Sequence, residues 1–229
     1  MSFTEKEIKI ANATSRSNGA SAINPDGTIR AIVPNFILKN IKDYRDKTIL
    51  DFGAGKEAIH TKWLRNNGLN VTAYDFGENC INEVHDKNAL DKRYDVIFAS
   101  NVLNVQSSDV MMETTLYQIY KSLKKGGKFI FNYPKSPRKL DMPEWELITL
   151  VSELFDRKVF NNEGIFTVVK PNDTDEKIFV SVKDGLVEEV YCSNRDMRLV
   201  IIDNDVLEEE LIIANKEASE EQKNYYKIY

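Results

Sequence analysis

Residues 48–58 read Thr-Ile-Leu-Asp-Phe-Gly-Ala-Gly-Lys-Glu-Ala, and this stretch decides the fold. Its apolar run, Thr48–Leu50, is typical of a buried strand, and Asp51 closes that run. Gly53 and Gly55 then turn the chain, because glycine permits conformations and close backbone approaches that a side chain prevents. A strand that ends on an acid and a glycine turn is expected to bring backbone N–H groups up to a nucleoside ligand.

Strands and helices alternate along the residues on both sides of this turn. Apolar runs predict strands near 47–51, 69–75, 94–100 and 128–133, and helical spacing predicts helices near 36–44, 56–67, 108–124 and 143–156. Asn161–Gly164 separates two short β-rich runs and predicts a hairpin, and Lys124–Gly127 is typical of a helix end. The order predicts an α/β fold with a doubly wound, mostly parallel seven-stranded sheet and a closing antiparallel hairpin.

Length and charge divide the chain. At 229 residues, of which 42% are hydrophobic, it suits one main domain with an appendage. Residues 1–171 carry 24 Lys and Arg against 21 Asp and Glu (+3), and residues 172–229 carry 7 against 15 (−8). We therefore expect a lead segment or lid over 1–33, a main domain over 34–171, and a small acidic β-rich module with a C-terminal helix over 172–229.

Composition also bears on location and ligands. No apolar run reaches about 18 residues and the N-terminus is polar, which predicts a cytoplasmic protein without a membrane segment. Cys80 and Cys192 fit no metal spacing, so reduced thiols and no metal site are expected. A body near electrical neutrality lacks the broad basic face typical of nucleic-acid-binding proteins. The oligomeric state is not indicated.

The glycine turn by itself fits two nucleotide-binding patterns. Gly53–Ala58, with Asp75 about twenty residues further on, satisfies a loose dinucleotide pattern, so a nicotinamide-dependent dehydrogenase stays open. Three features favour the other pattern: Asp51 precedes the glycines, a hairpin follows the last parallel strand, and Lys124–Lys128 leads into a strand just before a proline loop.

Four motifs in this order resemble the class I S-adenosylmethionine-dependent methyltransferases over about residues 47–170. They are LDFGAG (50–55), Asp75, YDVIFASNVLNV (94–105) and LKKGGKFIF (123–131). The resemblance implies S-adenosylmethionine as the cofactor and a methyltransferase activity, of a type found in phage or mobile-element proteins. Two departures from the family pattern are Glu57, where many members have a third glycine, and the short segment 75–95, which is broken by Gly77 and Asn79.

The resemblance also implies roles for individual residues. Asp75 would accept both ribose hydroxyls, Asp51 would meet the methionine ammonium, and Asp86 or Asn88 would accept from the adenine amine. The full set of expected cofactor-binding residues is Asp51, Gly53, Ala54, Gly55, Asp75, Phe76, Asp86, Asn88 and Ser100.

Acceptor-side residues are expected at the ends of the fourth and fifth strands of the family pattern. Asn101, Asn104 and Asn132 are the candidates, although Asn101 and Asn104 can equally be helix caps. The Pro-Pro-aromatic sequence of DNA amino-methyltransferases is missing after Ser100. The cations at 135, 138 and 139 fit phosphate groups or a solvated turn equally well.

The lead segment, which carries Ser-Arg, and the Asn-Val-Leu-Asn-Val sequence at 101–105 resemble methyltransferases of mobile-element DNA-modification clusters. This resemblance favours a nucleic acid or nucleobase acceptor slightly over a small metabolite, and a non-catalytic cofactor-binding or interaction protein stays open. His60 and His85 are expected to be structural, with His85 the better candidate for a general base.

Overall fold

A computed structural model describes residues 4–10, 24, 28–81, 83–134, 139–172, 178–183 and 186–192, the last two ranges by their backbone alone. The chain forms two compact units, Met1–Asp175 and Glu176–Tyr229. In the second unit, β7 (Ile178–Lys183) and β8 (Leu186–Cys192) pair as an antiparallel hairpin. The strand predicted near 198–202 and the C-terminal helix lie outside the described residues.

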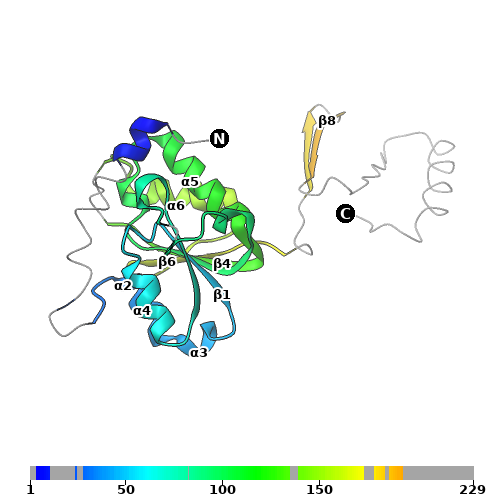
Figure 1. Ribbon diagram of the computed structural model, residues 1–229. Helices are drawn as coiled ribbons and strands as arrows, with labels where there is room; N and C mark the ends of the chain where they lie inside the picture. Colours follow the sequence, from blue (N-terminus) through cyan, green and yellow to red (C-terminus); the bar gives the residue numbers. More distant parts are fainter. Residues whose placement is uncertain are drawn as a thin grey trace. The chain divides into compact units, whose positions relative to one another are not determined.

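The first unit is built on a six-stranded sheet with the order β2-β1-β3-β4-β6-β5 (Figure 1). Neighbours among β2, β1, β3 and β4 run parallel, whereas β6 is antiparallel to both β4 and β5. The mostly parallel sheet and its closing antiparallel hairpin are therefore confirmed. The strands are β1 (Thr48–Phe52), β2 (Asn70–Tyr74), β3 (Tyr94–Ala99), β4 (Leu123–Asn132), β5 (Phe160–Asn162) and β6 (Ile165–Val169).

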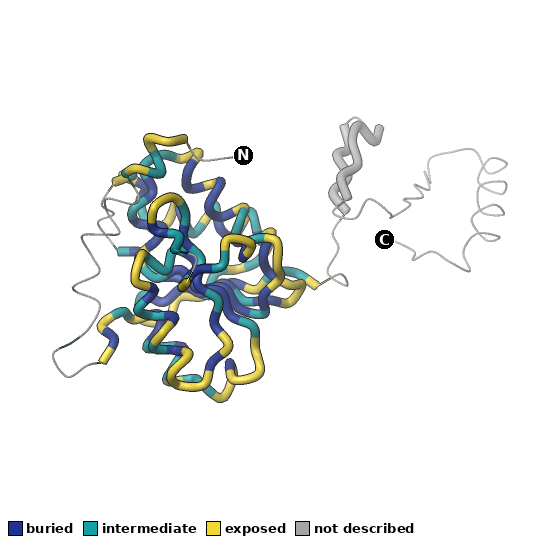
Figure 2. Tube along the Cα trace, in the orientation of Figure 1, coloured by how far each residue is buried: buried dark blue, intermediate teal, exposed yellow. Residues whose placement is uncertain are grey.

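Helices cover both faces of this sheet (Figure 1). One face carries α2 (Ile32–Lys39), α3 (Ile41–Tyr44) and α4 (Ile59–Asn66), and the other carries α5 (Asp109–Ser122) and α6 (Glu144–Phe155). Successive residues of β1 supply opposite cores, since Ile49 packs with the first set of helices and Leu50 with the second. The central strands are accordingly the most buried part of the unit (Figure 2).

The sheet has six strands where the sequence predicted seven. Residues 75–93 form no strand in their described part and instead contain two 3₁₀ turns, η2 (Gly77–Asn79) and η3 (Ala89–Asp91). Gly77 has a φ of 62°, and a glycine interrupts a strand or helix because it has no side chain to pack there. The short segment thus crosses from β2 to β3 without adding a strand.

The lysine–glycine stretch after α5 starts a strand, so its prediction as a helix end was wrong. The helix stops at Ser122 and β4 begins at the next residue. Gly126 adopts a φ of 71°, and its N–H donates to the carbonyl of Lys170 at 3.0 Å. The ammonium of Lys170 donates to the carbonyls of Tyr120 and Leu123 at 2.8 and 3.1 Å, which satisfies acceptors at the end of α5.

The predicted hairpin at Asn161–Gly164 is present between β5 and β6. Glu163 and Gly164 both have positive φ, at 52° and 82°, which is the conformation of a type I′ turn. The side-chain oxygen of Asn161 accepts the Gly164 N–H at 3.0 Å.

The described start of the chain is a short helix over residues 5–10. Thr4 and Glu7 form a capping box, in which the Glu7 N–H donates to the Thr4 hydroxyl and the Thr4 N–H donates to the Glu7 carboxylate. The Ser108 hydroxyl also donates to Glu7 at 2.7 Å, so this helix docks at the start of α5. The described helices include none with the length and apolarity needed to cross a bilayer.

Candidate functional site

The strand order reverses its direction between β1 and β3, and this reversal is the switch point of the sheet. The chain runs from β1 outward to β2, and then returns to the other side of β1 with β3 and β4. Open α/β sheets bind ligands at such a switch point, outside the carboxyl ends of the strands. The glycine turn follows β1, and Ser100–Asn104 follows β3, so the predicted cofactor and acceptor residues meet at this edge.

The glycine turn is held from β2. The N–H groups of Gly53 and Ala54 both donate to the carbonyl of Tyr74 at 2.9 Å, and the Gly55 N–H donates to Asp75 at 2.7 Å. These N–H groups already have partners, which corrects the expectation that they would face a ligand. The turn instead offers a surface without side chains, because Gly53 and Gly55 have φ values of 77° and 71° that favour glycine.

Val102 packs directly on Gly53. A Cβ built on Gly53 would lie 2.6 Å from a methyl carbon of Val102, well inside van der Waals contact. Val102 is buried in the loop that follows β3. The two sides of the switch point are therefore in contact, and only glycine fits at residue 53.

Asp75 closes β2 and lies against the glycine turn. It is 5% exposed, and its second oxygen accepts the N–H of Phe76 at 2.8 Å. Burial raises the pKa of this carboxyl, and hydrogen bonds from Phe76 and Gly55 oppose that rise. A carboxylate has about four acceptor positions, so the two backbone bonds and a side-chain hydrogen bond from Asn79 leave about one position for a hydroxyl group of a ligand.

Asp51 lies behind the turn and is 1% exposed. The hydroxyl of Thr61, on α4, donates to it at 2.7 Å. Burial raises the pKa of Asp51 to about 7. A cation bound nearby would lower that pKa and be attracted by the resulting carboxylate, which is the charge relation expected for a ligand ammonium.

Asp86 and Asn88, the adenine-side candidates, lie in the crossing segment between β2 and β3. Asp86 forms an ion pair with Lys92 at 2.6 Å and accepts the N–H of Asn88 at 2.9 Å. The hydrogen bond from Lys92 is the main reason that the pKa of Asp86 is lowered. The Asp86 N–H donates to the carbonyl of Ala73, which fixes the segment beside β2, and Asn88 is exposed.

The acceptor-side asparagines are brought together at the ends of β3 and β4. The Asn101 N–H donates to the side-chain oxygen of Asn132 at 2.8 Å, and the Asn132 amide returns a bond to the Asn101 side chain at 2.7 Å. Asn101 has a φ of 59°, a conformation that asparagine tolerates better than most residues.

Asn104 and Ser100 are polar groups without a visible partner. The side-chain oxygen of Asn104 is buried and accepts no hydrogen bond within the described part of the chain, and the hydroxyl of Ser100 is in the same state. Helix capping was the alternative role for Asn101 and Asn104. Neither caps α5, because Ser108 caps that helix by accepting the N–H of Met111. A buried acceptor without a donor suits a ligand that brings one.

His85 uses both of its ring nitrogens within the protein. Its Nδ1 accepts the N–H of Ile81 at 3.1 Å, and its Nε2 lies 2.9 Å from the carbonyl oxygen of Gly55. The ring is 5% exposed. These contacts argue against a general base, which needs a free nitrogen within reach of substrate. The ring nitrogen Nε2 of His60 is buried and has no hydrogen-bond partner among the residues that the structure describes, and burial lowers the pKa of His60 to about 4.

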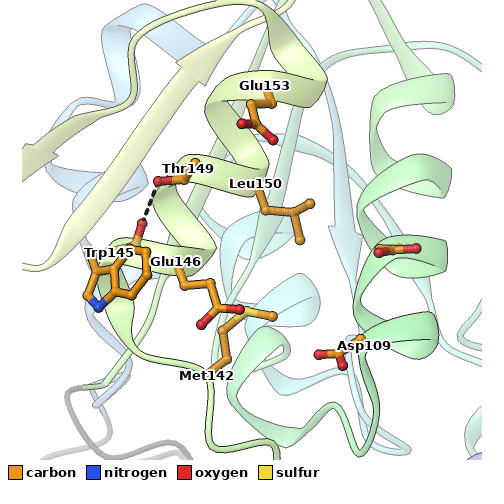
Figure 3. A pocket seen from close by; sticks show the side chains of 8 residues that line it. Asp109, Met142, Trp145, Glu146, Thr149, Leu150 and Glu153 are labelled. Atoms are coloured by element: carbon orange, nitrogen blue, oxygen red, sulfur yellow. Dashed lines mark hydrogen bonds between the residues drawn. The ribbon is translucent and has the colours of Figure 1, made fainter.

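A groove elsewhere on the unit lies between α5 and α6 (Figure 3). Carboxylates of Asp109, Glu146 and Glu153 line it together with the exposed ring of Trp145. None of the predicted site residues borders this groove, so we assign it no part in binding the cofactor. Among the residues that the structure describes, no cluster of His, Cys, Asp or Glu could hold a metal ion.

Two residues that contact the candidate site were not among the predicted site residues. Thr61 holds Asp51, and Val102 packs on Gly53. The ten-residue separation of Thr61 from Asp51 gives no sequence signal, since the contact depends on how α4 packs on the sheet. Val102 lies within a motif already singled out, but its contact partner is 49 positions away.

Comparisons with known proteins agree on the type of domain. A family model described as a methyltransferase domain matches residues 24–165. A Burkholderia thailandensis 1,6-didemethyltoxoflavin-N1-methyltransferase, solved with S-adenosylhomocysteine, superposes with a TM-score of 0.51 at 17% identity, covering 75% of this chain and 92% of that one.

Two other solved structures resemble the chain more loosely. A TehB-like methyltransferase from Corynebacterium glutamicum gives a TM-score of 0.45 at 17% identity, with 72% of this chain and 97% of that one covered. The N-methyltransferase NodS from Bradyrhizobium japonicum gives 0.47 at 13% identity, with 71% and 100% covered. A search of curated protein sequences gave no significant match.

Proposed function

Because the chain belongs to the methyltransferase domain family, we propose that it methylates a nitrogen or oxygen atom that still carries a hydrogen. The enzyme is S-adenosylmethionine-dependent, and the class I fold expected from the sequence is confirmed. A nicotinamide-dependent dehydrogenase is thereby set aside. The proposal concerns which residues hold the cofactor and what kind of acceptor the site takes.

The carboxylates at the ends of β1 and β2 support the cofactor side of the proposal. Asp75 binds the ribose hydroxyls with the acceptor capacity that Gly55, Phe76 and Asn79 leave over. Burial raises the pKa of Asp51 to about 7, and the ammonium of the methionine part, once bound nearby, favours its ionised form behind the turn. Ala54, with the two glycines beside it, forms the surface on which the cofactor lies, and Asp86 or Asn88 contacts the adenine.

The asparagines at the ends of β3 and β4 carry the acceptor side. The buried side-chain oxygen of Asn104 lacks a donor within the described residues, and Asn101 and Asn132 hold each other in place. An amide oxygen that accepts an N–H or O–H of the substrate orients the lone pair of that atom toward the methyl group. The cofactor supplies an activated methyl group, so the protein has to align the acceptor and exclude water.

The source of the acceptor group stays a prediction. The nucleic-acid preference rested on the Asn101–Val105 sequence and on the Ser-Arg of the lead segment, which lies outside the described residues. The proposed contacts suit an amine of a nucleobase and an amine or hydroxyl of a small metabolite alike. The experiment must therefore separate these two sources.

Calorimetric titration with S-adenosylmethionine tests the cofactor side. Asp75→Ala should weaken binding by about 10-fold or more, because lost hydrogen bonds to a charged group amount to about 1.5–3 kcal/mol. Asn70→Ala is the matched control, since Asn70 is exposed at the amino end of β2, on the opposite edge of the sheet. Absence of binding heat for the unaltered protein at millimolar cofactor would refute the proposed site.

Transfer of a radiolabelled methyl group tests the acceptor side. DNA, RNA and the low-molecular-weight fraction of a cell extract are offered separately, and the labelled pool identifies the source. Asn101→Ala and Asn132→Ala should each slow transfer without weakening cofactor binding, and the double variant should be no worse than either, because the pair acts as one unit. A protein that binds the cofactor but labels no pool would instead be a non-catalytic binder.

A further inference from the structure

Gly55 is held at both of its backbone polar groups by the segment that follows β2. Its N–H donates to Asp75 at 2.7 Å, and its carbonyl oxygen lies 2.9 Å from Nε2 of His85. The two partners are 20 and 30 positions further along the chain. The glycine turn is thus fixed by residues outside itself, at the point where the cofactor is expected to lie.

The contacts of His85 determine which nitrogen carries the proton. Nδ1 accepts the N–H of Ile81, so it has no proton of its own, and Nε2 must then carry the hydrogen. The bond to Gly55 is therefore Nε2–H donating to a carbonyl oxygen. The backbone N–H of His85 also donates to the carbonyl of Ile81 at 2.7 Å, so residues 81 and 85 close a small ring that orients the imidazole.

We propose that His85 is a positioning residue, whose neutral Nε2–H form holds the carbonyl of Gly55 and thereby shapes the turn that binds S-adenosylmethionine. Removing the ring leaves that carbonyl with the Ala58 N–H, at 3.0 Å, as its donor, and removes the bond that ties the turn to the segment after β2. Both ring nitrogens of His85 contact backbone atoms of the protein, so His85 acts on cofactor affinity through Gly55. This inference rests on the proposed cofactor site and extends it.

The crossing segment explains why a histidine serves this purpose here. Between β2 and β3, the described part of residues 75–93 forms two 3₁₀ turns and no strand. The Asp86 N–H, bonded to the carbonyl of Ala73, ties the segment to β2 directly after His85. The bond from His85 to Gly55 links this segment to the glycine turn as well. The segment therefore supports the turn in place of a full helix and strand.

The first experiment observes the tautomer directly. The chain has two histidines, so His60→Leu leaves a single imidazole in the nitrogen-15 spectrum of the full-length protein. His60 is a suitable position because its buried Nε2 has no hydrogen-bond partner in the described part of the chain. A neutral ring with the proton on Nε2 is expected, and a proton on Nδ1 would overturn the proposal.

The second experiment measures affinity for S-adenosylmethionine by calorimetry. His85→Leu should weaken binding by about tenfold or more, because the Gly55 carbonyl loses its only assigned side-chain donor. His85→Gln should stay within about threefold of the unaltered protein, since its amide can donate to the same carbonyl. His60→Leu should bind unchanged.

Each outcome decides between the roles of His85. Binding by His85→Leu that equals the unaltered protein overturns the positioning role while the Asp75 result still supports the cofactor site. If His85→Leu does not fold, the tautomer and His85→Gln decide: a proton on Nε2 with near-normal affinity supports the proposal, and a proton on Nδ1 overturns it. If the unaltered protein does not bind the cofactor, the proposed function fails first, and this inference fails with it.

Discussion

Replacing Gly53 by alanine tests the contact that joins the two sides of the switch point. The new Cβ would lie 2.6 Å from a methyl carbon of Val102, so the two groups must move apart. Overpacking of this kind costs about 1–3 kcal/mol. The φ of 77° adds about 1–2 kcal/mol for any residue with a side chain. We expect Gly53→Ala to lower the free energy of unfolding by about 2–5 kcal/mol.

Two further variants separate these contributions. Gly68 has a φ of 84°, and a Cβ there would meet nothing within 4 Å, so Gly68→Ala should lose only the conformational part, about 1–2 kcal/mol. Val102→Ala removes the methyl groups that a side chain at residue 53 would strike. The double variant Gly53→Ala with Val102→Ala should therefore be more stable than the sum of the two single losses predicts, by about 1–3 kcal/mol.

Urea unfolding followed by tryptophan fluorescence measures these differences. Both tryptophans, Trp63 and Trp145, belong to the unit Met1–Asp175, so the signal reports on the unit that contains the site. A loss for Gly53→Ala no larger than that for Gly68→Ala would refute the overpacking argument. Additive losses in the double variant would show that Val102 is not the residue in the way.

Two other predictions use the same fluorescence measurement. Burial raises the pKa of Asp51 from 3.8 to about 7. Between these two values the folded protein keeps a proton that the unfolded chain releases. The contribution of this carboxyl to stability therefore falls as the pH rises from about 4 to about 7. Asp51→Asn should be increasingly more stable than the unaltered protein across that interval, by an amount on the order of a few kcal/mol at pH 7. A stability difference between the two proteins that does not change with pH would contradict this. Lys170→Met should lower the free energy of unfolding by about 1–3 kcal/mol, because the carbonyls of Tyr120 and Leu123 lose their donor. Lys121→Met, on the exposed side of α5, is the control, and equal losses for the two lysines would contradict the assignment.

Much of the fold was predictable because its signals are local. A few neighbouring residues are enough to predict the conformation of three features: the run that ends at Asp51, the glycines after it, and the turn at Asn161–Gly164. The missed features depend on partners elsewhere. Lys124–Gly127 has the composition of a helix end, but it lies within β4, where Leu123 and Lys128 on either side of it pair with β3, and Gly126 and Gly127 bond to the backbone of Lys170. The segment 75–93 is too short and too interrupted to supply the seventh strand, and composition alone did not fix its path.

The features of the candidate site also divide into those that the sequence predicted and those that it did not. The candidate residues Asp51, Asp75 and Asn101 were predicted from motif positions, because a parallel sheet places the carboxyl ends of its strands at one edge. Their partners were not found, since hydrogen bonds such as those from Thr61 to Asp51 and from His85 to Gly55 join residues 10 and 30 positions apart. The prediction that backbone N–H groups of the turn face a ligand was wrong because Tyr74 and Asp75 accept them.

The sequence by itself determined the alternation of strands and helices, the position of the glycine turn and the chemical groups at the edge of the sheet, because each follows from short-range geometry and residue type. Only the tertiary structure decided which of those groups are already paired and which are buried without a partner. Hydrogen-bond partners and burial depend on how distant segments pack, and a periodic pattern holds no information on that packing.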